Sequence, residues 1–276
     1  MMHVTSAMKW IDVNGVSLRY ELSGAGAGAQ TVVLVHELGG CLDSWDETLP
    51  AFQQHFRVLR YDQRGFGQSE KVSGTLCTYQ LDDMVADIAA LLDALAITSP
   101  VHVVGSALGA GIAAAFAARN RQRVARLVVQ SLVTRSNPAT RPHMVARAAE
   151  VERTGMRVQA QASLDRSYPE ALRVGNGNRE RFESYRARWI TNDPQSFAAI
   201  NRMLLDMEVD AELGDIACPT LSIGCQHDVM RPPTMVQELT KLIPGARYVE
   251  ADSGHFMHAQ TPALFAKMVL PFLQEK

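Results

Sequence analysis

The feature that most constrains the fold is a tight passage from a buried strand into a helix. The apolar run VHVVG at 101–105 is typical of a buried strand, and Gly109 to Ala118 has the pattern of a helix. The two are joined by G-S-A-L-G, a turn in which small residues such as Gly105 and Gly109 let strand and helix approach closely. The pattern therefore predicts a strained turn with Ala107 at its tip.

Strand-like and helix-like segments alternate on both sides of this turn. A hairpin is expected at the N-terminal end, with strands at 9–13 and 17–22 joined by Asn14-Gly15. The later segments with strand character are TVVLVH (31–36), FRVLRYD (56–62), RLVVQSL (126–132), PTLSIG (219–224) and ARYVEA (246–251), and DDMVADIAALLDAL (82–95) is helical. Short strand-helix-strand periods of this kind predict an α/β protein with a mostly parallel sheet and helices on both faces.

The alternation stops between about Thr134 and Leu213. This stretch holds several prolines, a GNGN turn and helical segments with charged faces, but no buried strand pattern. We expect a helical cap at 134–213, inserted into a core formed by 1–133 and 214–276. An insertion at this point would lie over the carboxyl ends of the strands, where open α/β sheets bind ligands. The alternative is a set of packing helices with no part in catalysis.

The charge and cysteine composition indicates which kinds of partner the chain binds. The chain has 276 residues with 27 basic and 29 acidic side chains, so it has no electrostatic signature for nucleic acid or an anionic membrane. A small-molecule substrate is favoured, and a homo-oligomer remains open. The absence of a secretory pattern at the start and of a long apolar run predicts a cytoplasmic protein. The cysteines lack metal-ligand spacing and indicate neither a metal site nor disulfides: Cys41, Cys77, Cys218 and Cys225.

The glycine frame of the turn assigns the nucleophile position to Ala107, where serine is expected. A methyl group cannot attack a carbonyl or form an acyl-enzyme. Three explanations stay open. Alanine replaces a parental serine in an inactivated variant, or alanine is native and the chemistry uses an activated water or no nucleophile, or the register shifts so that Ser106 attacks. The non-catalytic interpretation of Ser106 is a packed, hydrogen-bonded hydroxyl.

A base and an acid are expected from two later loops. His255 follows a Ser-Gly turn in D-S-G-H-F-M-H, and histidine suits general base catalysis near neutral pH. His258 is a rival that we place on the following helix. Asp228, in G-C-Q-H-D, follows the strand at 219–224 and suits the role of orienting the imidazole. The loop at 130–134, another source of such an acid, contains no carboxylate.

Two backbone N–H groups, of Leu38 and Leu108, are predicted to form an oxyanion hole. Leu38 lies in H-E-L-G-G, where two glycines let the chain fold back beneath the turn. Glu37 in this loop could repel an oxyanion, orient a water or point to solvent, and we favour the last. The Asp62-Arg64 pair in Y-D-Q-R-G-F-G-Q-S is interpreted as a structural pair that holds a turn.

Five motifs in this order resemble the α/β-hydrolase superfamily. H-E-L-G-G is similar to its H-G-x-G-G loop, with Glu37 in place of a glycine. Y-D-Q-R-G-F-G-Q-S is similar to D-x-R-G-x-G-x-S, and G-S-A-L-G is similar to the nucleophile elbow except at Ala107. G-C-Q-H-D and D-S-G-H resemble the acid and histidine segments. The resemblance implies the α/β-hydrolase fold, with a helical cap inserted before the acid-bearing strand.

Within the superfamily the chain looks most like 3-oxoadipate enol-lactonases and aminoacrylate hydrolases, and the latter can carry alanine in a G-H-A-L-G elbow. The resemblance implies a cofactor-free hydrolase of a small ester, lactone or amide, with Ser-His-Asp chemistry that Ala107 impairs. A native alanine implies water activated by His255 and Asp228, or proton-transfer chemistry. A non-catalytic ligand-binding homologue is the third option. For an acidic substrate, Arg141 is the candidate ligand, with Arg135 and Arg147 beside it in sequence.

Overall fold

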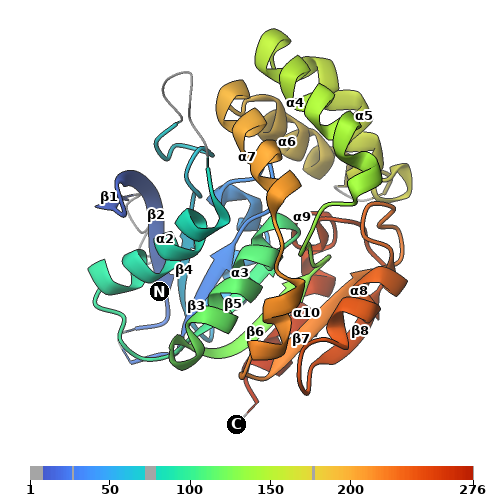
Figure 1. Cartoon of the computed structure of the whole chain (residues 1–276). Coiled ribbons are helices and arrows are strands. Elements are labelled where there is room, and N and C mark those ends of the chain that lie inside the picture. Colours follow the sequence, from blue (N-terminus) through green and yellow to red (C-terminus); the bar gives the residue numbers. More distant parts are fainter. Residues whose placement is uncertain (1–8, 27, 72–78, 176–177, 276) are drawn as a thin grey trace.

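The computed structural model describes residues 9–26, 28–71, 79–175 and 178–275 (Figure 1). Cys77, the first eight residues and the two central residues of the GNGN turn, on which parts of the sequence argument depend, lie outside these ranges. Within the described part of the chain, no helix has the length and apolarity needed to cross a membrane.

The centre of the molecule is a sheet whose strands follow the order β1-β2-β4-β3-β5-β6-β7-β8. The strands are β1 (Lys9–Val13), β2 (Val16–Gly24), β3 (Thr31–Val35), β4 (Arg57–Tyr61), β5 (Val101–Ser106), β6 (Val124–Gln130), β7 (Thr220–Cys225) and β8 (Arg247–Ala251). β2 runs antiparallel to β1 and β4, whereas all pairs from β4 to β8 are parallel. The predicted mostly parallel sheet is therefore confirmed.

Helices cover both faces of this sheet. They are α1 (Leu49–Gln53), α2 (Leu81–Ala94), α3 (Leu108–Arg119), α8 (Pro233–Thr240), α9 (Met257–Gln260) and α10 (Pro262–Leu273). Because side chains alternate along a strand, neighbouring residues of β3 enter different cores. Val33 belongs to the cluster with α2, α3 and α8, and Leu34 to the cluster with α1 and α10.

A bundle of helices interrupts the core between β6 and β7. It consists of α4 (Arg141–Thr154), α5 (Arg157–Ser167), α6 (Asn178–Ile190) and α7 (Pro194–Asp206), which we call the cap. The segments that lead into and out of the cap lie side by side. Arg135 and Glu208 form an isolated antiparallel β-bridge through their backbones, and the Val209 N–H donates to the Thr134 carbonyl at 2.9 Å. The cap follows the carboxyl end of β6 and gathers at one end of the sheet (Figure 1).

The D-Q-R-G turn after β4 is structural, but its two charged residues do not pair with each other as predicted. Asp62 is fully buried and pairs with Arg19 at 3.3 Å. Arg64 pairs at 2.6 Å with Asp87, a buried carboxylate on α2. The charges are separated because each buried carboxylate takes an arginine from a different element, so the turn is fixed to both β2 and α2.

Candidate active site

Ala107 has the backbone of a strained elbow, with φ 50° and ψ −113°. Its N–H donates to the Gln130 carbonyl at 2.9 Å, which fixes the turn against β6. A Cβ at Gly105 would lie 2.3 Å from the Gly109 carbonyl oxygen, and one at Gly109 would lie 2.2 Å from the Val35 carbonyl oxygen. Both glycines are therefore required by close backbone approach, and they hold residue 107 at the start of α3.

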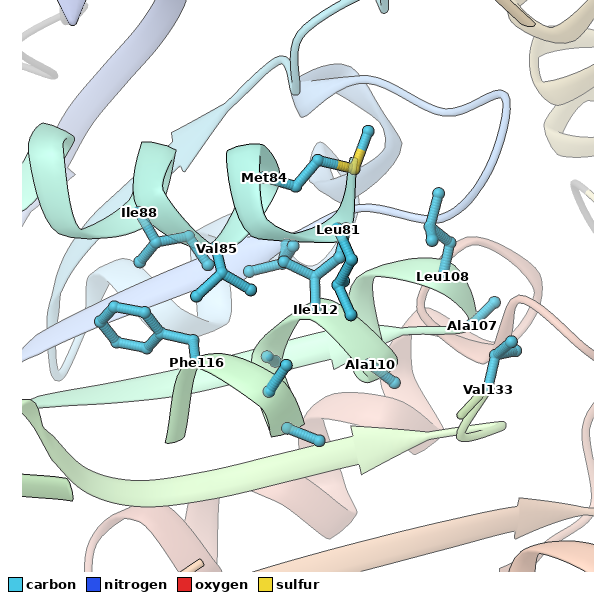
Figure 2. Packing of buried hydrophobic residues seen from close by; sticks show 14 of the residues in the cluster. Leu81, Met84, Val85, Ile88, Ala107, Leu108, Ala110, Ile112, Phe116 and Val133 are labelled. Atoms are coloured by element: carbon cyan, nitrogen blue, oxygen red, sulfur yellow. The ribbon is translucent and has the colours of Figure 1, made fainter. Parts of the chain in front are cut away.

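The alanine is part of the core. Figure 2 shows Ala107 at the head of α3 with Leu108 beside it, while α2 packs along the helix through Val85 and Ile88. Ala107 is only 2% exposed. The elbow is thus supported from below by packed apolar side chains, and its geometry does not depend on a hydroxyl at residue 107.

Ser106 occupies a different environment. It is fully buried at the end of β5, and its hydroxyl donates to Gln130 Oε1 at 2.7 Å. This is the packed, hydrogen-bonded role described above as the alternative to catalysis. Residue 107, rather than 106, is the one in the elbow conformation.

The two residues predicted as base and acid meet in the structure. The His255 Nδ1–H donates to Asp228 Oδ2 at 2.7 Å, and both side chains are buried. Asp228 Oδ1 accepts from the backbone N–H groups of Met230 and Arg231, each at 2.9 Å. Burial disfavours the carboxylate, but the charge and hydrogen bond of His255 keep the pKa of Asp228 below its ordinary value. The pair is suited to hold the imidazole with Nε2 unprotonated.

Gln130 was missed by the sequence argument. Besides Ser106, its amide reaches the His255 carbonyl, with Nε2 donating at 3.2 Å. The side chain thereby connects the elbow strand to the histidine loop. The polar pair Gln130-Ser131 directly after the apolar run 127–129 was the available signal, and Ser131 in turn hydrogen-bonds Asp228.

The predicted oxyanion donors are placed by a turn and a helix start. The Gly40 N–H donates to the Glu37 carbonyl at 3.1 Å, and Gly39 has φ 80°, as a type II turn requires. Leu38 is the second residue of this turn, and its N–H takes no part in the hydrogen bond that closes the turn. Leu108 is the first residue of α3, where helix N–H groups have no intrahelical acceptor and the dipole favours negative charge.

The cap rests directly on this turn. Asn192 Nδ2 donates to the Gly39 carbonyl at 2.8 Å. A Cβ at Gly39 would lie 2.9 Å from Trp189 and 3.4 Å from Phe197, both on cap helices. Glycine at this position therefore permits both the positive φ and the close contact with the cap, and Trp189 and Phe197 form an aromatic wall beside Gly39.

Glu37 does not point to solvent, so that expectation is wrong. The residue is fully buried, with Oε1 accepting from the Ser44 hydroxyl and Oε2 accepting from His258 Nε2, each at 3.0 Å. Burial opposes ionisation, but the charge and hydrogen bond of His258 lower the pKa of Glu37 to about 2. Two polar partners compensate the buried carboxylate, and neither could be inferred from the neighbouring sequence. His258 lies on the helix after the histidine loop, α9, as expected.

The three candidate arginines differ in their surroundings. Arg141 is half exposed, pairs with Asp206 at 2.8 Å and lines a surface pocket at the base of the cap whose lining includes neither Asp228 nor His255. Arg135 is also exposed and paired.

Arg147 is half-buried, with its guanidinium 5.6 Å from the centre of the Phe197 ring. Its buried Nε has no hydrogen-bond partner among the described residues. Burial, with the nearby charge of Arg166, lowers the pKa of Arg147 to about 10, so the side chain stays cationic at neutral pH. Phe197 also lies against Gly39, so one side chain separates Arg147 from the turn at 37–40, which we call the oxyanion turn after its predicted donor Leu38.

Comparisons relate the chain to known hydrolases. A family model described as the alpha/beta hydrolase fold matches residues 30–262. Putative carbamate hydrolases RutD from Caulobacter sp. (strain K31) and Pantoea ananatis (strain LMG 20103) are 31% and 30% identical, over 93% and 91% of this chain and 95% and 90% of theirs. The enol-lactonase from Burkholderia xenovorans LB400 superposes with a TM-score of 0.89 at 31% identity, covering 97% of this chain and 100% of that one.

Proposed function

Because the chain belongs to the α/β-hydrolase family, we propose that it hydrolyses a small ester, lactone, amide or carbamate. The observation that carries the proposal is the buried Asp228–His255 pair, which is retained beside an elbow with the strained geometry of a nucleophile turn. The hydrolase relatives support the reaction class. The names of the carbamate hydrolases and the enol-lactonase supply the candidate bonds.

With alanine at the elbow, the nucleophile in this proposal is water. The water oxygen attacks the carbonyl carbon while His255 Nε2 accepts a proton from the water. Asp228 stabilises the resulting imidazolium. The N–H groups of Leu38 and Leu108 stabilise the oxyanion. The tetrahedral intermediate then collapses, the bond to the leaving group breaks, and His255 returns the proton to that group. No acyl-enzyme forms.

A parental serine at residue 107 is the competing version of the same function. The φ of 50° at Ala107 favours it, since strain of this kind persists where a nucleophile must be presented. In that version the serine hydroxyl attacks with His255 as base, an acyl-enzyme forms, and water activated by His255 releases the acid. Acid, base and oxyanion donors keep the same roles.

The substrate in this proposal carries a carboxylate or another anion. Arg147 supports this, because its cationic guanidinium lies on the ring of Phe197 with Nε unpartnered among the described residues. The aromatic wall of Trp189 and Phe197 favours a small, partly apolar acyl group.

The test is to assay the protein, Ala107→Ser and His255→Ala on short activated esters, lactones and carbamates. Activity in the protein that falls by about 10²- to 10⁴-fold in His255→Ala supports activated water. Activity gained only in Ala107→Ser, with an acyl adduct in the intact mass, supports the serine version. Turnover in none of the proteins on any of these substrates overturns the hydrolase proposal.

A further inference from the structure

A second carboxylate–imidazole pair lies buried beneath the proposed site. Glu37 and His258 are both fully buried and are joined at 3.0 Å. Neither has a part in the chemistry described above. Burying two ionisable groups is unfavourable because both lose their hydration, unless good geometry and further hydrogen bonds compensate. The role of a buried pair next to the oxyanion turn is indicated by the two segments that it joins.

The pair connects the oxyanion turn to the histidine loop. Glu37 directly precedes Leu38, and His258 lies on α9, three residues after His255. The second carboxylate oxygen is bound by Ser44, in the short helix that follows the turn. The Glu37–His258 contact is thus a direct link between the residue adjoining an oxyanion donor and the element that follows the base.

The carboxylate is folded over its own turn. A Cβ at Gly40 would lie 2.4 Å from Glu37 Oε1. The carboxylate therefore packs against Gly40, in the same turn that carries the Leu38 N–H. The hydrogen bond from the Gly40 N–H to the Glu37 carbonyl joins the same two residues through the backbone.

The partner imidazole is equally confined. The ring of His258 lies 4.1 Å from that of Trp45, centre to centre. Its Nδ1 is buried without a hydrogen-bond partner among the described residues, so Glu37 is its polar anchor. The cap closes the cluster through Tyr185, whose pKa is raised well above its ordinary value by burial together with the charge of Glu37.

We propose that Glu37 and His258 are positioning residues that hold the Leu38 N–H and the His255 loop in one fixed arrangement. Neither residue touches the substrate in this proposal. Its structural part stands on the contacts alone, whereas its effect on turnover rests on the proposed function.

The structural part is tested by amide hydrogen exchange at Gly40, whose N–H reports the turn. The variants are Glu37→Ala and His258→Leu, with Glu37→Gln as the conservative change that keeps the bond to Ser44. Asp252→Asn is the matched control, because Asp252 and His227 form an exposed carboxylate–imidazole pair at 2.8 Å. Exchange at Gly40 about tenfold faster in the two disruptive variants, and unchanged in Asp252→Asn, is expected. Unchanged protection of Gly40 in the disruptive variants overturns the proposal.

The kinetic part is measured well below each variant's melting temperature, on a substrate that the protein turns over. A misplaced oxyanion donor acts on the transition state, so kcat is expected to fall about 10- to 100-fold with KM within about twofold. Glu37→Gln is expected to recover most of kcat. A lowered melting temperature with unchanged kcat marks a purely structural pair and overturns the positioning role. If only Ala107→Ser turns over a substrate, the same variants are compared in that background. Should neither the protein nor Ala107→Ser turn over any substrate, the proposed function fails, while the exchange experiment still decides the structural part.

Discussion

The described part of the chain holds two buried carboxylate–imidazole pairs, which differ in what surrounds them rather than in their chemistry. The Asp228–His255 pair lies in loops, with two backbone N–H groups holding the free carboxylate oxygen. The imidazole of the Glu37–His258 pair lies on a helix and packs against Trp45, with the two rings tilted by 31°. In our proposals the first pair acts as a base because it lies at the elbow, whereas the second, packed against Trp45, fixes the backbone around Leu38.

Replacing His255 or Asp228 distinguishes the two pairs most strongly. His255→Gln removes the proposed base, and Asp228→Asn leaves the imidazole in the wrong tautomer, so each is expected to lower kcat about 10³-fold or more. The melting temperature is expected to change little in His255→Gln. Steady-state kinetics and thermal unfolding check this. Comparable losses of kcat from replacing Glu37 would break the distinction drawn between the pairs.

Acid unfolding tests Glu37 through its ionisation. Its pKa of about 2 lies below the ordinary value of 4.5, so its contribution to stability is present above pH 4.5 and is lost as the pH falls towards 2. The Glu37→Gln variant has no carboxylate at this position and therefore cannot lose this stabilisation on acidification. Its melting temperature is expected to fall less between about pH 5 and about pH 3 than that of the unchanged protein. Asp252→Asn serves as control, since Asp252 is exposed. Parallel acid curves for Glu37→Gln and the unchanged protein would contradict a charged, compensated Glu37.

The sequence predicted the elements that carry local signals. The order of the strands, the elbow at Ala107 and the helical stretch between β6 and β7 follow from patterns within a few residues, although strand ends differ by up to two residues, as in β2 (predicted 17–22, observed Val16–Gly24). Asp228 and His255, 27 positions apart, were instead predicted from the loops after two successive strands. These signals work because close backbone approach and turn geometry are requirements of the local chain.

Long-range pairing could not be predicted in the same way. Glu37 was assigned to solvent because its partner is 221 positions away in the chain. The Asp62-Arg64 pair was assumed from proximity in sequence, whereas each residue pairs with another element. The role of Gln130 depends on three segments that only the folded sheet brings together. A buried charge is decided by partners from distant elements, and a single sequence does not reveal them.

The arginines of the cap offer a comparison between binding and catalysis. Arg147→Met is expected to raise KM for a carboxylate-bearing substrate about tenfold or more, because a hydrogen bond to a charged group contributes about 1.5–3 kcal/mol. Its kcat is expected to stay nearly constant, unlike that of the His255 and Asp228 variants. Arg141→Met is the matched control at the surface of the cap. A change in KM confined to Arg141→Met would reassign the anion site to that residue.

The smallest effect concerns the elbow itself. Ala107 holds a backbone conformation that side chains disfavour, and such strain costs on the order of 1–3 kcal/mol. Ala107→Gly is therefore expected to stabilise the protein by about 1 kcal/mol, offset in part by the greater freedom of glycine in the unfolded chain. Thermal unfolding measures this as a rise of about 2–4 °C. Ala113→Gly, within the same helix, is the control and is expected to destabilise by about 1 kcal/mol, because its backbone is ordinary α-helix. A destabilised Ala107→Gly would mean that the alanine methyl contributes more as packing in the core than it costs as strain. The elbow would then be held by its apolar support, and a native alanine at residue 107 would be the better account of the chain.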